Sequence, residues 1–209
     1  MSTRFFTYAA ACLSALLLVA CGAKQAPITV DSQSSVPGTQ VTRKGEVLAL
    51  TGTGIRVGQQ LPETRLIDAM AMQPVNLADN RGRILFLSIV PSIDTKVCEA
   101  QTHSLAEQGD RLPAAVRRIT VSRDTPFAQA RFAEEAGLKD IEYLSDYKEG
   151  EFGRSVGLLI ESSRLLARAV ILVDAQGVVR YIQVVPDTTH LPDMDRAFAE
   201  AEELAKSVK

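Results

Sequence analysis

Cys98 is the residue of this chain that is best placed to act as a nucleophile. Cys98 lies three residues after Thr95. An apolar run at residues 84–90 precedes both and is followed by Pro91. This order predicts a strand followed by a helix that begins near Thr95, with the cysteine in its first turn. A helix start presents unpaired backbone N–H groups and the positive end of the helix dipole, which favour a negatively charged sulfur. Because the thiolate is the reactive form of cysteine, Cys98 is a candidate for attack on an electrophilic substrate.

The other two cysteines fall in an amino-terminal segment that is typical of an export signal. Residues 1–20 contain Arg4, a long apolar stretch and a Leu-Val-Ala ending directly before Cys21. This ending resembles a bacterial lipobox, which implies cleavage before Cys21 and attachment of lipid to its sulfur. A plain secretory signal or an uncleaved anchor is the alternative. We expect a cell-envelope protein anchored to a membrane through Cys21, and Gly22 favours the periplasmic face of the outer membrane.

Cys98 is then the only free thiol of the mature chain, because Cys12 leaves with the signal and Cys21 carries lipid. A single thiol can form neither an internal disulfide nor a CxxC pair. A disulfide scaffold and a dithiol oxidoreductase or metal-delivery protein are therefore disfavoured. The competing interpretation of a solitary cysteine is an unreactive, buried apolar residue.

Composition excludes several classes of function. A chain of 209 residues with 46% hydrophobic side chains can bury the core of one ordinary domain. Its 23 basic and 25 acidic residues leave a net charge of -2, without a basic stripe for nucleic acid. His103 and His190 are far apart and belong to no ligand motif, so we expect neither a metal nor a cofactor.

The order of predicted elements indicates an α/β domain at residues 41–209, after a lipidated and flexible tether at residues 21–40 that is rich in Ser, Gln, Pro and Thr. Parallel strands with crossover helices, then an antiparallel pair and a terminal helix, predict a mixed sheet flanked by helices, similar to the thioredoxin fold. Gly52 and Gly54 are expected to turn an amino-terminal β-hairpin. The expected strands are residues 46–51, 84–90, 116–122, 141–144, 168–174 and 178–185, and the expected helices are residues 95–109, 125–137, 149–156 and 192–208. Cys98 would lie at the carboxyl edge of the sheet, where open α/β sheets place their sites.

The segment around Cys98 is similar to the active-site motif of a known family. Residues 91–98 read PSIDTKVC, and the spacing P-x-x-x-T-x-x-C resembles that of peroxiredoxins, especially bacterial thiol peroxidases. Residues 41–45 resemble the family's amino-terminal hairpin, residues 122–129 (SRDTPFAQ) its S-x-D-x-PFAQ segment, and residues 167–170 its ARAV strand. The resemblance extends over nearly the whole domain. It implies a thioredoxin-like fold, reduction of hydroperoxides at the expense of a thiol, and a homodimer.

The resemblance also implies roles for four residues. Cys98 matches the peroxidatic cysteine, Thr95 the hydroxyl that steadies thiolate and peroxide, Pro91 the residue that shields the sulfur, and Arg168 the guanidinium that completes the site. Attack of a thiolate on one peroxide oxygen releases the other as an anion, so donors beside the sulfur suit the reaction. The alternatives are that Thr95 only caps a helix and that Arg168 is an exposed strand end paired with a carboxylate.

One position departs from the family pattern. Family members commonly carry a resolving cysteine where this chain has Ala133. A sulfenic acid at Cys98 would then be reduced by an external thiol, such as a small thiol, a thioredoxin-like protein or Cys98 of another subunit. The alternative is a peroxide-sensing or thiol-relay lipoprotein that acts through a mixed disulfide at Cys98. Asp124 and Phe127, in the PFAQ segment, are expected to border the pocket or a dimer contact.

Overall fold

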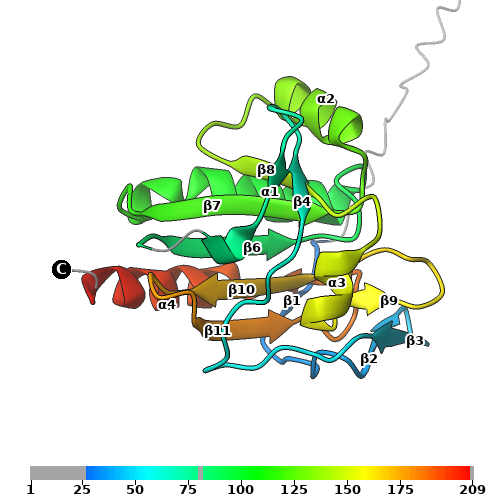
Figure 1. Ribbon diagram of the computed structural model, residues 1–209. Helices are drawn as coiled ribbons and strands as arrows, with labels where there is room; N and C mark the ends of the chain where they lie inside the picture. Colours follow the sequence, from blue (N-terminus) through cyan, green and yellow to red (C-terminus); the bar gives the residue numbers. More distant parts are fainter. Residues whose placement is uncertain (1–26, 80–81, 208–209) are drawn as a thin grey trace, which may run out of the picture.

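A seven-stranded mixed sheet forms the centre of the molecule, with the strand order β11-β10-β6-β7-β8-β4-β5 (Figure 1). The computed structural model describes residues 27–79 and 82–207. The predicted signal and the predicted lipid site at Cys21 lie outside these residues. The strands of the central sheet are β4 (Leu66–Asp68), β5 (Pro74–Val75), β6 (Ile84–Ile89), β7 (Val116–Ser122), β8 (Glu142–Ser145), β10 (Ala169–Val173) and β11 (Val179–Val184). None of the helices in the described ranges has the length and apolar character needed to cross a membrane.

Helices cover both faces of this sheet. They are α1 (Lys96–Glu107), α2 (Pro126–Ala136), α3 (Glu151–Val156) and α4 (Met194–Lys206), with short 3-10 turns at Leu77–Asp79 and Gly109–Arg111. All six residues of β6 are buried, and alternate side chains face opposite sides. Phe86 packs with Phe198 of α4, their ring centroids 5.0 Å apart, whereas Leu87 belongs to the core that includes Phe152 of α3. The predicted α/β architecture with a mixed sheet is confirmed.

Local sequence signals located α2 accurately. Its N-cap is Thr125, whose side-chain oxygen accepts a hydrogen bond from the backbone N–H of Ala128 at 3.3 Å. Pro126 occupies the first helical position, where no N–H is needed. Gly137 ends the helix in the left-handed conformation at φ 62. The other predicted helices and the buried strands lie within a few residues of their expected bounds.

The amino-terminal hairpin exists, but the prediction of its turn is wrong. Strands β2 (Gln40–Arg43) and β3 (Glu46–Thr51) pair antiparallel around Lys44 and Gly45, and β3 then pairs with β9 (Leu159–Ile160). Gly52, which was expected to turn the chain, instead permits a close backbone contact, because a Cβ there would lie 1.8 Å from the carbonyl oxygen of Arg154. A glycine that allows close approach and a glycine that forms a turn look the same in a sequence.

Part of the segment predicted as a tether is bound to the domain. Strand β1 (Val30–Asp31) pairs in parallel with β12 (Leu191–Pro192), and the Gln183 side chain donates to the carbonyl oxygens of Asp31 at 2.6 Å and Gln33 at 3.1 Å. The folded domain therefore begins before residue 41. The composition of residues 21–40 did not predict this contact, because it is formed by strand pairing and by polar hydrogen bonds to a distant part of the chain, which need no apolar side chains.

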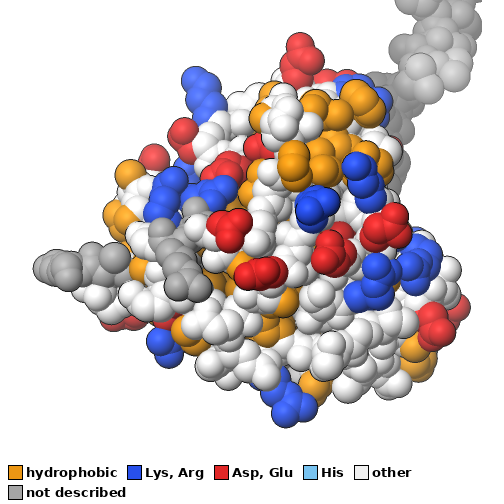
Figure 2. Space-filling view, viewed as in Figure 1, with side chains coloured by type: hydrophobic (Ala, Val, Ile, Leu, Met, Phe, Trp, Pro, Cys, Tyr) orange, Lys and Arg blue, Asp and Glu red, His pale blue; other side chains and the backbone are white. Residues whose placement is uncertain are grey.

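Charged side chains of both signs are interspersed on the face of the molecule that Figure 2 shows. Hydrophobic side chains gather on the upper part of this face, around α2. Phe127, at the second position of α2, is 73% exposed. It does not line the pocket described below.

Asp174 holds the turn between β10 and β11 and is expected to make the fold sensitive to acid. Burial alone would raise its pKa, but hydrogen bonds from the N–H groups of Val178 and Gln176 and from Arg180 lower the pKa below its ordinary value. The stabilisation is therefore complete above the unfolded pKa of about 3.9 and disappears as the pH falls through the folded pKa. We expect Asp174→Asn to reduce the free energy of unfolding by about 1–3 kcal/mol at pH 7.

Urea unfolding of both proteins at pH 7 and at pH 3 checks this expectation, since the difference should shrink at the lower pH. Asp110→Asn, which changes an exposed carboxylate, is the control. An equal difference at the two pH values would contradict an electrostatic origin.

Candidate active site

The loop after β6 places Cys98 at the carboxyl edge of the sheet. Thr95 is the N-cap of α1, with extended backbone angles of φ -131 and ψ 144, and Cys98 is the third helical residue. The Thr95 side chain does not cap the first turn. The first turn of a helix has backbone N–H groups without partners inside the helix, and Cys98 lies in this turn.

Arg168 contacts the sulfur of Cys98 directly. Its Nη2 atom lies 3.3 Å from Sγ, and both residues are buried, with 1% of Arg168 and 0% of Cys98 exposed. The register of the sheet explains the contact, because β10 runs antiparallel to β6 and pairs Ala169 with Ile89. Arg168 therefore lies beyond the end of β6, next to the loop that leads into α1. The alternative of an exposed strand end is wrong.

Neutral acceptors fix the orientation of the guanidinium. Nη1 of Arg168 donates to Oε1 of Gln101 at 2.8 Å, and Nε and Nη2 donate to the carbonyl oxygen of Thr188 at 3.2 and 3.1 Å. Gln101 is held in turn, since its amide donates to the hydroxyl of Ser88 at 2.8 Å. Within the described residues, no ion pair of Arg168 with a carboxylate is found. An anionic sulfur at Cys98 would balance this buried positive charge.

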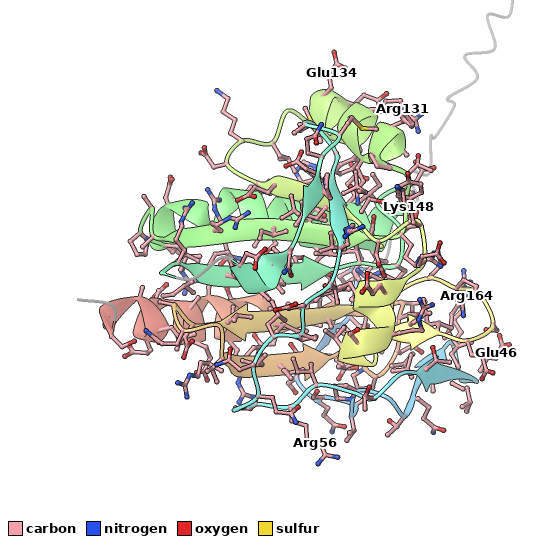
Figure 3. The ribbon with its side chains drawn as sticks, in the orientation of Figure 1. Glu46, Arg56, Arg131, Glu134, Lys148 and Arg164 are labelled. Carbon is pink, nitrogen blue, oxygen red and sulfur yellow. The ribbon has the colours of Figure 1, made fainter. Side chains whose placement is uncertain are left out.

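A pocket of about 440 Å³ opens beside this pair. Pro91, Thr95, Val97 and the buried Arg168 line it. Further lining residues come from the hairpin, from β9 and from the loop that follows β9, including Arg43, Leu48, Ile160 and Leu165. Figure 3 shows Glu46 and Arg164 at this end of the molecule. The structure thus brings Pro91, Thr95 and Arg168 to one pocket. The hydroxyl of Thr95 donates at 3.5 Å to the carbonyl oxygen of Ser92 rather than to the sulfur.

Comparison with known proteins shows the family of this chain. A family model described as Redoxin matches residues 56–198. The chain belongs to the redoxin family. Within it, the thiol peroxidase of Halalkalibacterium halodurans is 40% identical over 161 residues, which cover 77% of this chain and 96% of that protein. The thiol peroxidase of Bacillus subtilis is 36% identical over 167 residues, covering 80% of this chain and 99% of that protein. The resemblance to bacterial thiol peroxidases is confirmed.

Solved structures agree with the expected thioredoxin-like fold of the peroxiredoxins. A peroxiredoxin-like protein from Aquifex aeolicus superimposes with a TM-score of 0.75 at 31% identity, covering 81% of this chain and 99% of that one. A thiol peroxidase from Chromobacterium violaceum has a TM-score of 0.69 at 23% identity, with 81% and 98% of the two chains covered. The second of these supports the fold alone.

Asp124 of this redoxin domain holds the loop that carries the motif. One carboxylate oxygen accepts from the hydroxyl of Ser92 at 2.7 Å, and the other accepts from the N–H of Ile93 at 2.8 Å and from the hydroxyl of Ser122 at 2.6 Å. The sequence placed Asp124 at the pocket border or at a dimer contact. It does not line the pocket but ties the loop before α1 to the end of β7, and the dimer contact stays a prediction.

Asp124→Asn is expected to loosen this loop. An amide can present only one oxygen, so the N–H of Ile93 or the hydroxyl of Ser92 loses its acceptor. A buried donor without an acceptor costs about 1–3 kcal/mol in the free energy of unfolding. The rate of Cys98 oxidation by hydrogen peroxide should fall about ten- to hundredfold, because small misplacements of reacting groups slow reactions by this order. Stopped-flow oxidation and urea unfolding measure the two effects.

The exposed Asp94, in the same loop, provides the matched control for this prediction. Asp94→Asn removes a charge near the motif without removing an acceptor of Ser92 or Ile93. If both variants slowed oxidation equally, loop positioning by Asp124 would be excluded.

Sequence reasoning missed Gln101 and Thr188. A signal for Gln101 exists, because a residue three positions after Cys98 shares its side of a helix. Thr188 contributes a backbone oxygen, which carries no mark in the sequence. The acidic neighbours Asp94 and Glu99 are exposed, so they do not oppose a negative charge on the buried sulfur at close range.

Proposed function

We propose that this protein is a thiol-dependent peroxidase that reduces hydrogen peroxide and organic hydroperoxides through a sulfenic acid at Cys98. The 3.3 Å contact between the buried Arg168 guanidinium and the Cys98 sulfur, at the start of a helix, carries this proposal. The names of its relatives among the thiol peroxidases support it.

The proposed first step transfers one oxygen atom to the sulfur. The Cys98 thiolate attacks the terminal oxygen of ROOH, so that an S–O bond forms while the O–O bond breaks. The leaving RO⁻ takes up from solvent the proton that the Cys98 thiol had released and departs as ROH, and the sulfur is oxidised to the sulfenic acid. Negative charge moves from sulfur to oxygen during the attack. The Arg168 guanidinium and the N–H groups of the first helical turn are fixed donors for that charge.

Access to the sulfur requires a small movement, since Cys98 has no exposed surface. The first turn of α1 is suited to it, because Thr95 makes no side-chain cap there. Pro91 and Thr95 line the pocket beside the sulfur. In this proposal, they shield the sulfur and steady the peroxide.

An external thiol completes the cycle. Cys98 is the only free cysteine among the described residues. Ala133 occupies the position in α2 where family members commonly carry a resolving cysteine. A first thiol RSH condenses with the sulfenic acid to give a mixed disulfide and water. A second thiol then releases the Cys98 thiol and RSSR, so two thiols are oxidised for each peroxide reduced.

Mass analysis after peroxide addition tests the proposal. The full-length protein is mixed with one equivalent of hydrogen peroxide, and the peptide that contains Cys98 is trapped with a sulfenic-acid reagent. We expect loss of one free thiol per chain within seconds and the trapped adduct at Cys98. An unchanged thiol would overturn the proposal.

A peroxide sensor is the second candidate, because the described residues contain no second cysteine to resolve the sulfenic acid. A sensor would form one long-lived mixed disulfide with a partner protein. Repeated turnover with excess peroxide and a small thiol favours the enzyme, whereas one burst of consumption favours the sensor.

We also propose that a lipid on Cys21 anchors the protein in the cell envelope, at the periplasmic face of the outer membrane. The lipobox-like ending at residues 18–21 supports this location. The intact mass of membrane-extracted protein tests it, since the mature chain should begin at Cys21 and carry acyl groups.

The homodimer implied by the family resemblance is likewise a proposal, and sedimentation velocity of the detergent-free, delipidated protein tests it.

A further inference from the structure

A second hollow lies between the start of α1 and the end of α2. It has a volume of about 290 Å³ and adjoins the first pocket at Thr95. Its other lining residues come from the motif loop, the first turn of α1 and the last two turns of α2: Ile93, Asp94, Lys96, Glu99, Phe132, Glu135 and Ala136. The first pocket does not include any of these seven residues.

This hollow comes close to Cys98 through residues that do not line the first pocket. Val90, Ile93 and Cys98 form one buried cluster, and the partly buried Phe132 packs against it. Ile93 and Phe132 also line the hollow. A thin apolar layer therefore separates the hollow from the sulfur, while the guanidinium contacts the sulfur from the first pocket.

Reduction of the sulfenic acid by a thiol favours an approach that avoids the first pocket. The oxygen of a sulfenic acid formed in the first pocket would point toward Arg168. A thiolate that displaces this oxygen approaches the sulfur roughly in line with the breaking S–O bond, from its far side. The hollow beside Phe132 offers a route to the sulfur that Arg168 does not line, which such an approach requires.

The rim of the hollow is acidic. It carries the carboxylates of Asp94, Glu99 and Glu135 and the single ammonium of Lys96. Two of these carboxylates have long, exposed contacts with basic side chains, since Glu99 lies 3.9 Å from the imidazole of His103 and Glu135 lies 3.9 Å from Arg131. Arg131 and Glu134 extend outward from α2 in Figure 3. The excess of negative charge would repel an anionic thiol and attract a cationic one.

We propose that this hollow, named here the α1–α2 groove, is the entry site for the reducing thiol, and that it selects thiols with a positively charged group over anionic ones. The inference rests on the proposed function. In the step itself, the incoming thiolate forms an S–S bond to Cys98 and the S–O bond breaks. The released hydroxide takes the proton lost by the thiol and leaves as water.

Double-mixing kinetics with three probe thiols test the groove. The full-length protein is oxidised with one equivalent of hydrogen peroxide and then mixed with 2-aminoethanethiol, 2-mercaptoethanol or mercaptoacetate. The three thiols are used at equal thiolate concentrations and low ionic strength. The measured quantity is the ratio of the rate constants for the cationic and the anionic thiol. We expect the Glu99→Gln/Glu135→Gln variant to lower this ratio about tenfold, the size expected for two exposed charges within a Debye length.

The Glu200→Gln/Glu203→Gln variant is the matched control, because it removes two exposed carboxylates from α4, away from the groove. It should keep the ratio of the natural protein. An unchanged ratio in the groove variant, or an equal fall in the control, would overturn the inference. The first mixing step separates the two proposals: absence of sulfenic acid defeats the proposed function, whereas its normal formation followed by reduction without charge selection defeats the groove alone.

Discussion

The Cys98→Ser variant is expected to lose all peroxide reduction above the rate at which thiol and peroxide react without protein. A serine hydroxyl stays protonated at neutral pH and is a far weaker nucleophile than a thiolate. Among the residues that the structure describes, the hydrogen-bond partners of Arg168 and Cys98 include no general base. Peroxide consumption in the presence of a small thiol, measured for the full-length protein, gives the comparison.

Cys21→Ser is the matched control for this prediction, since it replaces the other cysteine expected in the mature chain. It should abolish lipid attachment while peroxide consumption per molecule stays that of the natural protein. Residual catalysis by Cys98→Ser, or its loss in Cys21→Ser, would show that a different sulfur carries the reaction.

The part of the site that is local in sequence could be predicted from the sequence. Pro91, Thr95 and Cys98 lie within one loop and one helical turn, so their spacing and the preceding apolar run already place them together. Arg168 is separated from Cys98 by 70 residues. Only the family resemblance connected the two, because spacing along the chain does not reveal which strands become neighbours.

The remaining features depend on tertiary contacts that leave no local pattern. Thr188 offers a carbonyl oxygen to Arg168, and Asp124 reaches across to the loop that contains Ile93. The pairing of β1 with β12 is also formed by backbone groups. The motif was therefore visible before the structure, whereas the groups that hold it in position were not.

Burial reconciles the two interpretations of Cys98 that the sequence left open. The cysteine is as buried as an unreactive core residue, and it belongs to an apolar cluster with Val90 and Ile93. The buried guanidinium of Arg168 distinguishes it from such a residue, since an arginine is kept in a core only with partners for its donors. Those donors bind Gln101, Thr188 and the sulfur.

Replacing Arg168 by lysine is therefore expected to slow sulfenic acid formation by about 10²- to 10³-fold, although the formal charge is conserved. The loss of one fixed donor to a developing oxyanion has an effect of this size. The planar fork of arginine reaches Gln101, Thr188 and Cys98 at once, whereas an ammonium is a single point with a different reach. The second-order rate constant for oxidation by hydrogen peroxide, from stopped-flow measurements, is the relevant quantity.

Loss of stability alone could also slow the reaction, and Arg118→Lys separates the two causes. The side chain of Arg118 is only 12% exposed and donates to the carbonyl oxygens of Leu105 and Ala106, remote from the sulfur. Both variants should unfold more easily, because each leaves buried carbonyl oxygens without a donor. Only Arg168→Lys should lower the rate constant under conditions where both proteins remain folded. Equal rate constants for the two variants would mean that Arg168 supports the fold and takes no part in the transfer of charge from sulfur to oxygen.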